Sequence, residues 1–181
     1  MRFFKDSLLT MEPKLLVKFC LTVSLIASVG GAFAQQSGRP QDEQTHFGAE
    51  VAIREPTKIP ADVLSILRED KRNQTCLGDG ESPASITGSW FIGSRIQLSA
   101  NSDADLIVTA QNKCLLGANL VPFWVFRKTR ETHELVLSTN ALGLDVLNTR
   151  TNGYRDIRTG SATAESVRTV NFKFDGKEYR P

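Results

Sequence analysis

Residues 134–180, ELVLSTNALGLDVLNTRTNGYRDIRTGSATAESVRTVNFKFDGKEYR, decide the fold class. Near the end of this stretch, apolar side chains occupy every second position: Val170, Phe172 and Phe174. A strand places all three on one face. Asp175-Gly176 then matches a two-residue turn, and residues 177–179 are the expected returning strand. The stretch predicts a meander of antiparallel strands.

The start of the chain has the three parts of a secretory signal. Basic residues precede an apolar run at 19–29, and Ala32-Phe33-Ala34 stands before Gln35. The run is shorter than the roughly 20 residues of a membrane-spanning helix. We expect residues 1–34 to be a signal peptide cleaved after Ala34, which predicts a periplasmic or secreted protein with no membrane span after cleavage.

Loss of that segment leaves a nearly neutral protein. The chain has 22 basic and 20 acidic residues, and 18 of each sign remain after position 34. Such a balance does not favour a general surface for nucleic acid or anionic lipid.

Two cysteines remain after export, Cys76 and Cys114. An even pair in an oxidising compartment predicts a disulfide, which stabilises a loop of this length by roughly 3 to 4 kcal/mol. The two histidines, His46 and His133, lack the spacing of a zinc site. A CxxC redox motif is absent. We therefore expect no metal and no cofactor.

The rest of the chain predicts one domain of the α+β class, mostly β, at residues 58–181. Residues 35–57 are polar and are expected to be a flexible leader in which only Val51 and Ile53 hint at a strand. Residues 60–72 predict one packed helix with an apolar stripe formed by Val63, Ile66 and Leu67.

Strands are expected at 90–98 and 105–108 and along the final stretch, in a small antiparallel meander of about six to eight strands. Residues 123–126, Phe-Trp-Val-Phe, are apolar in both alternating directions. This predicts a central strand buried on two faces, one of them covered by the helix.

Two segments resemble one another. Residues 101–106 (NSDADL) and 152–157 (NGYRDI) share Asn, Asp and an aliphatic residue at the first, fifth and sixth places. Each follows an alternating strand and precedes an aromatic strand about 20 residues later, as in a degenerate two-unit repeat. Whether the two units share one sheet stays open.

At these residues the chain resembles bacterial exported proteins with the C-terminal signature nGyxDI…FdGkxY, present here at 152–157 and 174–179. It is also distantly similar to the FG-GAP or VCBS unit of integrin-type propellers, whose DxNxDGxxD loop precedes an aliphatic strand. The resemblance covers roughly residues 90–180 and implies export and a β-rich build more than an activity. A propeller needs four or more blades. The calcium loop also departs from the pattern, because Leu106 replaces its glycine and Asn112 its last glutamate.

Catalytic candidates are incomplete. His133 lies in a polar connection beside Glu131 and Glu134, and the carboxyl pair Asp145 and Asp156 matches a glycosidase only if the two face one another. No serine lies in a hydrolase elbow motif.

We therefore expect an exported, non-catalytic binding or inhibitor-like module of the bacterial cell envelope, whose partner is an envelope or extracellular protein. The alternatives are a small secreted hydrolase and a calcium-dependent adhesion unit. The candidate contact loop surrounds an aromatic anchor with cations: Arg150, Tyr154, Arg155 and Arg158. Its simpler interpretation is that Tyr154 packs over the sheet edge and the arginines are solvated.

Overall fold

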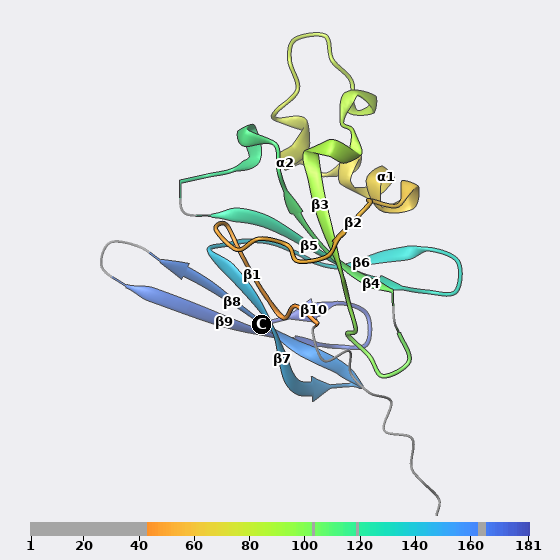
Figure 1. The fold of residues 1–181 in the computed structure, drawn as a ribbon, viewed down its shortest axis with the longest axis vertical. Coiled ribbons are helices and arrows are strands. Elements are labelled where there is room, and N and C mark those ends of the chain that lie inside the picture. Colours follow the sequence, from red (N-terminus) through yellow and green to blue (C-terminus); the bar gives the residue numbers. More distant parts are fainter. Residues whose placement is uncertain (1–42, 103, 119, 163–165) are drawn as a thin grey trace, which may run out of the picture. The chain divides into compact units, whose positions relative to one another are not determined.

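The computed structural model describes residues 43–102, 104–118, 120–162 and 166–181 (Figure 1). The predicted signal peptide and residues 35–42 of the predicted leader lie outside this part. Within it, ten strands form two antiparallel sheets of five, accompanied by short helices. The mostly β class is thus confirmed, and the two repeat units lie in separate sheets.

The central sheet has the order β2-β3-β4-β5-β6. Its strands are β2 (Pro56–Thr57), β3 (Phe91–Ile96), β4 (Asp105–Ala110), β5 (Val121–Lys128) and β6 (His133–Ala141). The C-terminal sheet has the order β1-β7-β8-β9-β10. Its strands are β1 (His46–Gly48), β7 (Gly143–Thr151), β8 (Tyr154–Ala162), β9 (Val167–Phe174) and β10 (Tyr179–Arg180).

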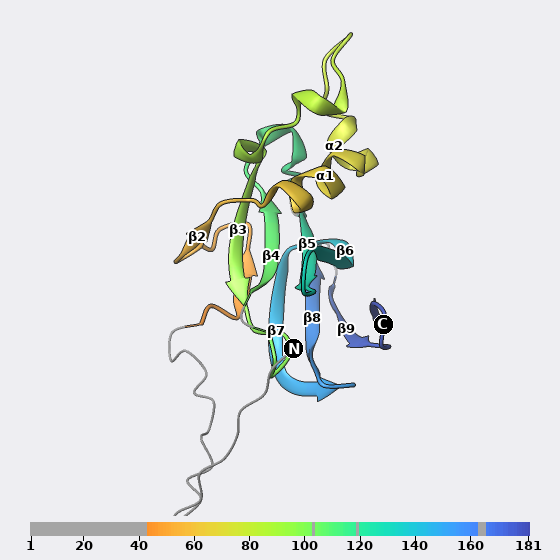
Figure 2. The ribbon, with the colours of Figure 1, turned by 90° about the vertical axis from the view of Figure 1, so that its right-hand side faces the viewer.

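Two apolar cores follow from the alternation of β5. Phe123 and Val125 face a core shared with Leu144 and Ile157 of the C-terminal sheet. Trp124 and Phe126 face a second core formed with the helices. Figure 2 shows these helices beside the strands of the central sheet. The prediction of a strand buried on both faces is therefore confirmed.

The predicted single helix is two helices, α1 (Ala61–Glu69) and α2 (Lys71–Gln74). The break lies at Asp70, whose backbone is extended. There its carboxylate accepts the Arg72 N–H at 2.9 Å and the Trp124 indole N–H at 2.6 Å. Val63 and Leu67 of the predicted stripe are fully buried, and Ile66 is partly buried.

The predicted leader differs from the structure after residue 42, because β1 and β2 lie within it. Phe47 is fully buried and pairs with Leu144, so this segment supplies a side chain to the core between the sheets. Val51 and Ile53 are not in a strand. The folded domain thus includes residues 43–57, a mostly polar segment with one fully buried aromatic residue, Phe47.

The turn between β9 and β10 also differs from the prediction, since it spans four residues rather than two. Asp175 accepts the backbone N–H groups of Lys177 and Glu178 with its carboxylate, each at 2.8 Å, which holds both residues in the turn. The two-residue hairpin turn is instead Asn152-Gly153, where both residues have positive φ.

Four consecutive strands of each sheet form a meander, β3-β4-β5-β6 in one and β7-β8-β9-β10 in the other. The internal repeat agrees with this order, because its aligned aspartate and aliphatic residues lie in the second strand of each meander, β4 and β8. Their aligned residues nevertheless point to different layers. Leu106 belongs to the core beneath the helices, whereas Ile157 belongs to the core between the sheets.

Candidate binding site

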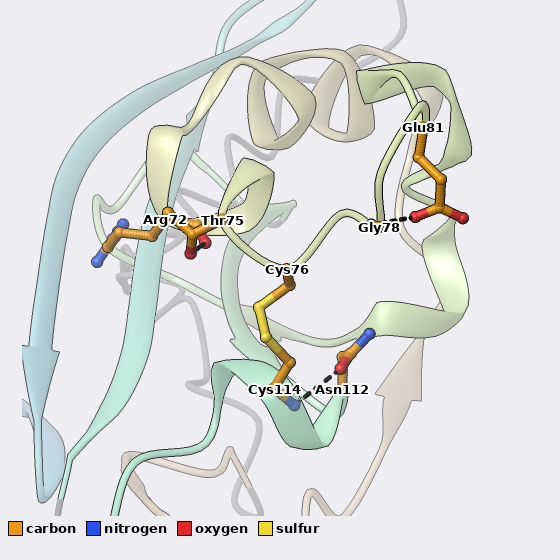
Figure 3. Close-up of a disulfide and its surroundings, with 7 residues drawn as sticks. All are labelled: Arg72, Thr75, Cys76, Gly78, Glu81, Asn112 and Cys114. Atoms are coloured by element: carbon orange, nitrogen blue, oxygen red, sulfur yellow. Dashed lines mark hydrogen bonds between the residues drawn. A yellow bond between two sulfur atoms is a disulfide. The ribbon is translucent and has the colours of Figure 1, made fainter.

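The predicted disulfide between Cys76 and Cys114 is present, with a Cα–Cα distance of 5.8 Å (Figure 3). It joins the segment after α2 to a 3-10 helix, Lys113–Leu115. Local hydrogen bonds hold both ends, since Asn112 Oδ1 accepts the Cys114 N–H at 2.9 Å and the Asn73 carbonyl accepts the Cys76 N–H at 3.2 Å. The bridge therefore connects two segments that are already ordered locally.

A groove of about 290 Å³ lies against this disulfide. Its wall combines polar and apolar side chains, among them Arg72, Thr75, Leu115, Leu120, Pro122 and Asn140. Leu116 and Leu120 are 41% and 40% exposed. Leu120 lines the groove and Leu116 lies in the same loop, so this loop presents two large apolar side chains to solvent.

The loop that carries these leucines turns tightly at Gly117. Its N–H donates to the carbonyl of Leu120 at 3.1 Å. A Cβ at position 117 would approach that carbonyl oxygen to 3.0 Å, so the closure favours glycine.

Arg72 forms the polar wall of the groove and is held from several sides. It pairs with Asp70 at 2.6 Å, lies 4.8 Å above the Trp124 ring and donates to Asn140 Oδ1 at 2.8 Å. Burial opposes ionisation of Asp70, yet the hydrogen bonds from Arg72 and Trp124 lower the pKa of its carboxyl. Arg72 is thus part of a rigid wall that joins α2 to β5 and β6.

A second hollow, of about 350 Å³, lies at the start of the described chain against Gln44 and His46. Gln44 donates to the carbonyls of His46 and Ala52 and accepts the backbone N–H of Arg54. The Gln44 side chain is therefore used in holding the turn, and none of the strongly exposed apolar residues of the described chain lines this hollow.

The structure separates the four residues of the predicted contact loop. Arg155 is 1% exposed, where it pairs with Glu43 at 2.6 Å and donates to the carbonyls of Val146 and Leu147. A residue so buried cannot touch a partner, and Arg155 is therefore a structural residue. Sequence reasoning missed this because Glu43 lies 112 positions away.

The other three residues face different surroundings. Tyr154 is partly buried and packs on Phe174 with ring centres 4.2 Å apart. Arg150 donates to the carbonyls of Leu98 and Gly153, while Arg158 pairs with Asp145 on the face of β7 and β8. Binding at this loop stays a prediction, but the four side chains do not form one patch.

Both histidines are paired with a carboxylate. His133 Nδ1 lies 2.9 Å from Asp62 Oδ2, and its side chain is 9% exposed. Burial opposes ionisation of Asp62, but hydrogen bonds with the His133 ring and backbone lower the pKa of its carboxyl to about 2. His46 lies 2.5 Å from Asp145.

The two carboxyl groups of the predicted glycosidase pair have different hydrogen bonds, and the predicted calcium set is not assembled in the described part. Asp145 bonds His46 and Arg158, whereas Asp156 is buried and one of its oxygens has no hydrogen-bond partner among the described residues. Asp105 accepts the backbone N–H groups of Leu98 and Lys128. The described residues contain no group of three His, Cys, Asp or Glu side chains that could hold a metal, and Asp103 of the predicted loop lies outside them.

Comparison of the chain with protein-family models, curated proteins and solved structures finds no match. The resemblance to exported proteins and to FG-GAP or VCBS units therefore stays a prediction. No helix of the described chain is both long and apolar enough to cross a membrane.

Proposed function

We propose that this chain is an exported, non-catalytic module of the bacterial cell envelope that binds a protein partner, in the manner of an inhibitor. The single observation that carries the proposal is the groove beside the disulfide, which is lined by the exposed Leu120, with the exposed Leu116 in the same loop.

The physical basis is a preformed apolar surface on a rigid support. Binding costs conformational entropy wherever loops must become ordered, so a surface held in place before contact binds more tightly for the same area. Here the disulfide, the Gly117 turn and the bonds of Arg72 hold the groove. Export agrees with the disulfide, because such bonds persist in oxidising compartments.

Affinity capture tests this function. The chain, expressed with its full sequence in a bacterial host, is purified from the exported fraction and used to capture partners from cell-envelope extract. Mass spectrometry of the purified chain should give a first residue of Gln35.

The decisive comparison uses two double variants of equal apolar loss. Leu116→Ser with Leu120→Ser should reduce recovery of the captured partner by roughly tenfold or more, because the contact loses apolar area. The control is Leu135→Ser with Leu142→Ser, which removes leucines that are 37% and 42% exposed elsewhere. Equal recovery with both double variants would refute the groove as the binding site, and a chain retained with residue 1 intact would refute export.

A further inference from the structure

β9 has an open backbone edge along most of its length. On one side, β8 pairs with each residue from Val167 to Phe172. On the other side, β10 pairs only with Lys173 and Phe174. No other strand of the described residues pairs with β9, so the edge from Val167 to Phe172 is free there.

The turn after β9 shows which backbone groups point to the open side. Asp175 donates its N–H to the carbonyl of Glu178 at 2.9 Å, toward the β10 side. Successive residues of a strand direct their backbone groups to alternate sides. The residues that direct them to the open side are therefore Val167, Thr169 and Asn171.

An independent contact supports this assignment. Asn152 lies in the turn before β8, and its side-chain amide donates to the carbonyl of Phe174 at 2.8 Å. The backbone of Phe174 thus faces the β8 side, as the alternation from Asp175 requires.

The side chains along the edge are accessible. All residues from Val167 to Asn171 are exposed, with Val167 at 75% and Val170 at 39%. Phe172 follows and packs against the core between the sheets. An added strand would therefore meet apolar surface that is continuous with this core.

Charge determines the kind of strand that the edge accepts. β9 carries Arg168 and Lys173 and no acidic residue, and neither cation forms an ion pair with a described residue. A second copy of this chain would bring two more cations to the same edge. An acidic segment would instead find complementary charge, which also speeds encounter.

We propose that the open edge of β9 pairs with an extended acidic segment of another protein, which adds a strand to the C-terminal sheet. The inference rests on the proposed binding function and gives the partner a second contact, away from the groove. Cations on the edge disfavour self-association while they admit this ligand.

The edge can be tested with a defined probe. A capped octapeptide of alternating valine and glutamate carries a fluorescent label, and its anisotropy is measured during titration with the oxidised exported chain. The matched peptide has lysine in place of glutamate. We expect the acidic peptide to bind at least about tenfold more tightly than the basic one, with affinity falling as salt rises.

Two substitutions at one position isolate the backbone contact. Thr169→Pro removes an N–H on the open side only, which an edge strand tolerates. It should weaken binding roughly tenfold, whereas Thr169→Ala keeps the N–H and should change it less than about twofold. Circular dichroism and the urea midpoint check that both variants are folded.

A charge reversal keeps the test decisive if Thr169→Pro does not fold. Arg168→Glu with Lys173→Glu should reverse the preference toward the basic peptide. No binding of the acidic peptide, equal binding of both peptides, or dimers in sedimentation that the charge reversal does not affect would overturn the inference. If envelope capture persists while peptide binding fails, only the proposed binding at the β9 edge is refuted. If the peptide binds but no partner is captured from the envelope, the proposed binding at the groove is refuted.

Discussion

β5 and β9 are the third strands of two meanders, β3-β4-β5-β6 and β7-β8-β9-β10, yet they differ in pairing and in burial. β5 is paired along both edges, by β4 and β6, and its first six residues are buried. β9 is paired along one edge by β8 and along the other only at its last two residues, by β10, and its first five residues are exposed. The difference shows that strand order alone does not determine burial. A covering layer does, and the helices cover only the central sheet.

The largest expected effect compares one aromatic residue from each strand. Trp124→Ala should lower the free energy of unfolding by about 3 to 5 kcal/mol, because it leaves a cavity and removes the ring that bonds Asp70. Phe172→Ala, at a partly buried position, should cost about 1 kcal/mol. Urea unfolding monitored by circular dichroism measures both. Equal losses would show that β9 is as well packed as β5.

The disulfide sharpens the comparison, because it ties together segments on the helical side of the central sheet. Its cysteines are 38 positions apart, so the chain-entropy relation gives about 4 kcal/mol for closing the loop. Cys76→Ala with Cys114→Ala should therefore lower the free energy of unfolding by about 2 to 4 kcal/mol. Reduction of the wild-type chain is the control and should cause a similar loss, whereas reduction of the double variant should change nothing.

The aligned aspartates of the repeat come next. Asp105→Ala leaves the buried N–H of Leu98 and that of Lys128 without their acceptor, and we expect a loss of about 1 to 3 kcal/mol. Asp156→Ala removes a carboxylate that already has an unpartnered oxygen among the described residues, so its cost should be about 1 kcal/mol or less. Urea unfolding at pH 7 distinguishes the two. A larger loss for Asp156→Ala would contradict this account.

The smallest effect concerns pH. The pKa of Asp62 falls from 3.8 to about 2 in the folded chain, so its pairing with His133 stabilises the fold above about pH 4. This contribution is lost as pH falls toward 2, because the carboxyl then takes up a proton. Asp62→Asn should cost about 1 kcal/mol or less at pH 5, after screening by solvent, and nothing near pH 2.

A second test of this pH effect uses Asp145 of β7, in the C-terminal sheet. The pKa of Asp145 is also lowered, because its bonds with His46 and Arg158 outweigh the cost of burial. Asp145→Asn should therefore give a stability profile of the same sign. A loss that grows on acidification for Asp62→Asn would refute the assignment.

The covered strand could be predicted from sequence, and the open one only in part. Four consecutive apolar residues at 123–126 can be satisfied only by cover on both faces, which the structure confirms. The alternation of Val170, Phe172 and Phe174 correctly gives a strand with one apolar face. It does not reveal how much of this face the central sheet covers, and Val170 remains 39% exposed.

The remaining differences have local causes. Asn152-Gly153 is the stronger hairpin signal, since both residues adopt positive φ readily. Asp175-Gly176 has a similar composition and forms a longer turn because the Asp175 side chain bonds the next backbone groups. The groove was missed because Leu116 and Leu120 lie in a connection whose shape depends on the disulfide.

Tyr179, in the two-residue strand β10, helps to close the core between the sheets. Its ring is buried against Phe174, and its hydroxyl donates to the carbonyl of Arg155 at 2.7 Å. Burial, with the nearby charges of Asp105 and Asp156, raises the pKa of this phenol. Deletion of residues 179–181 would thus open the core, so the unfolding midpoint of that shortened chain is a convenient readout of how much this closure contributes.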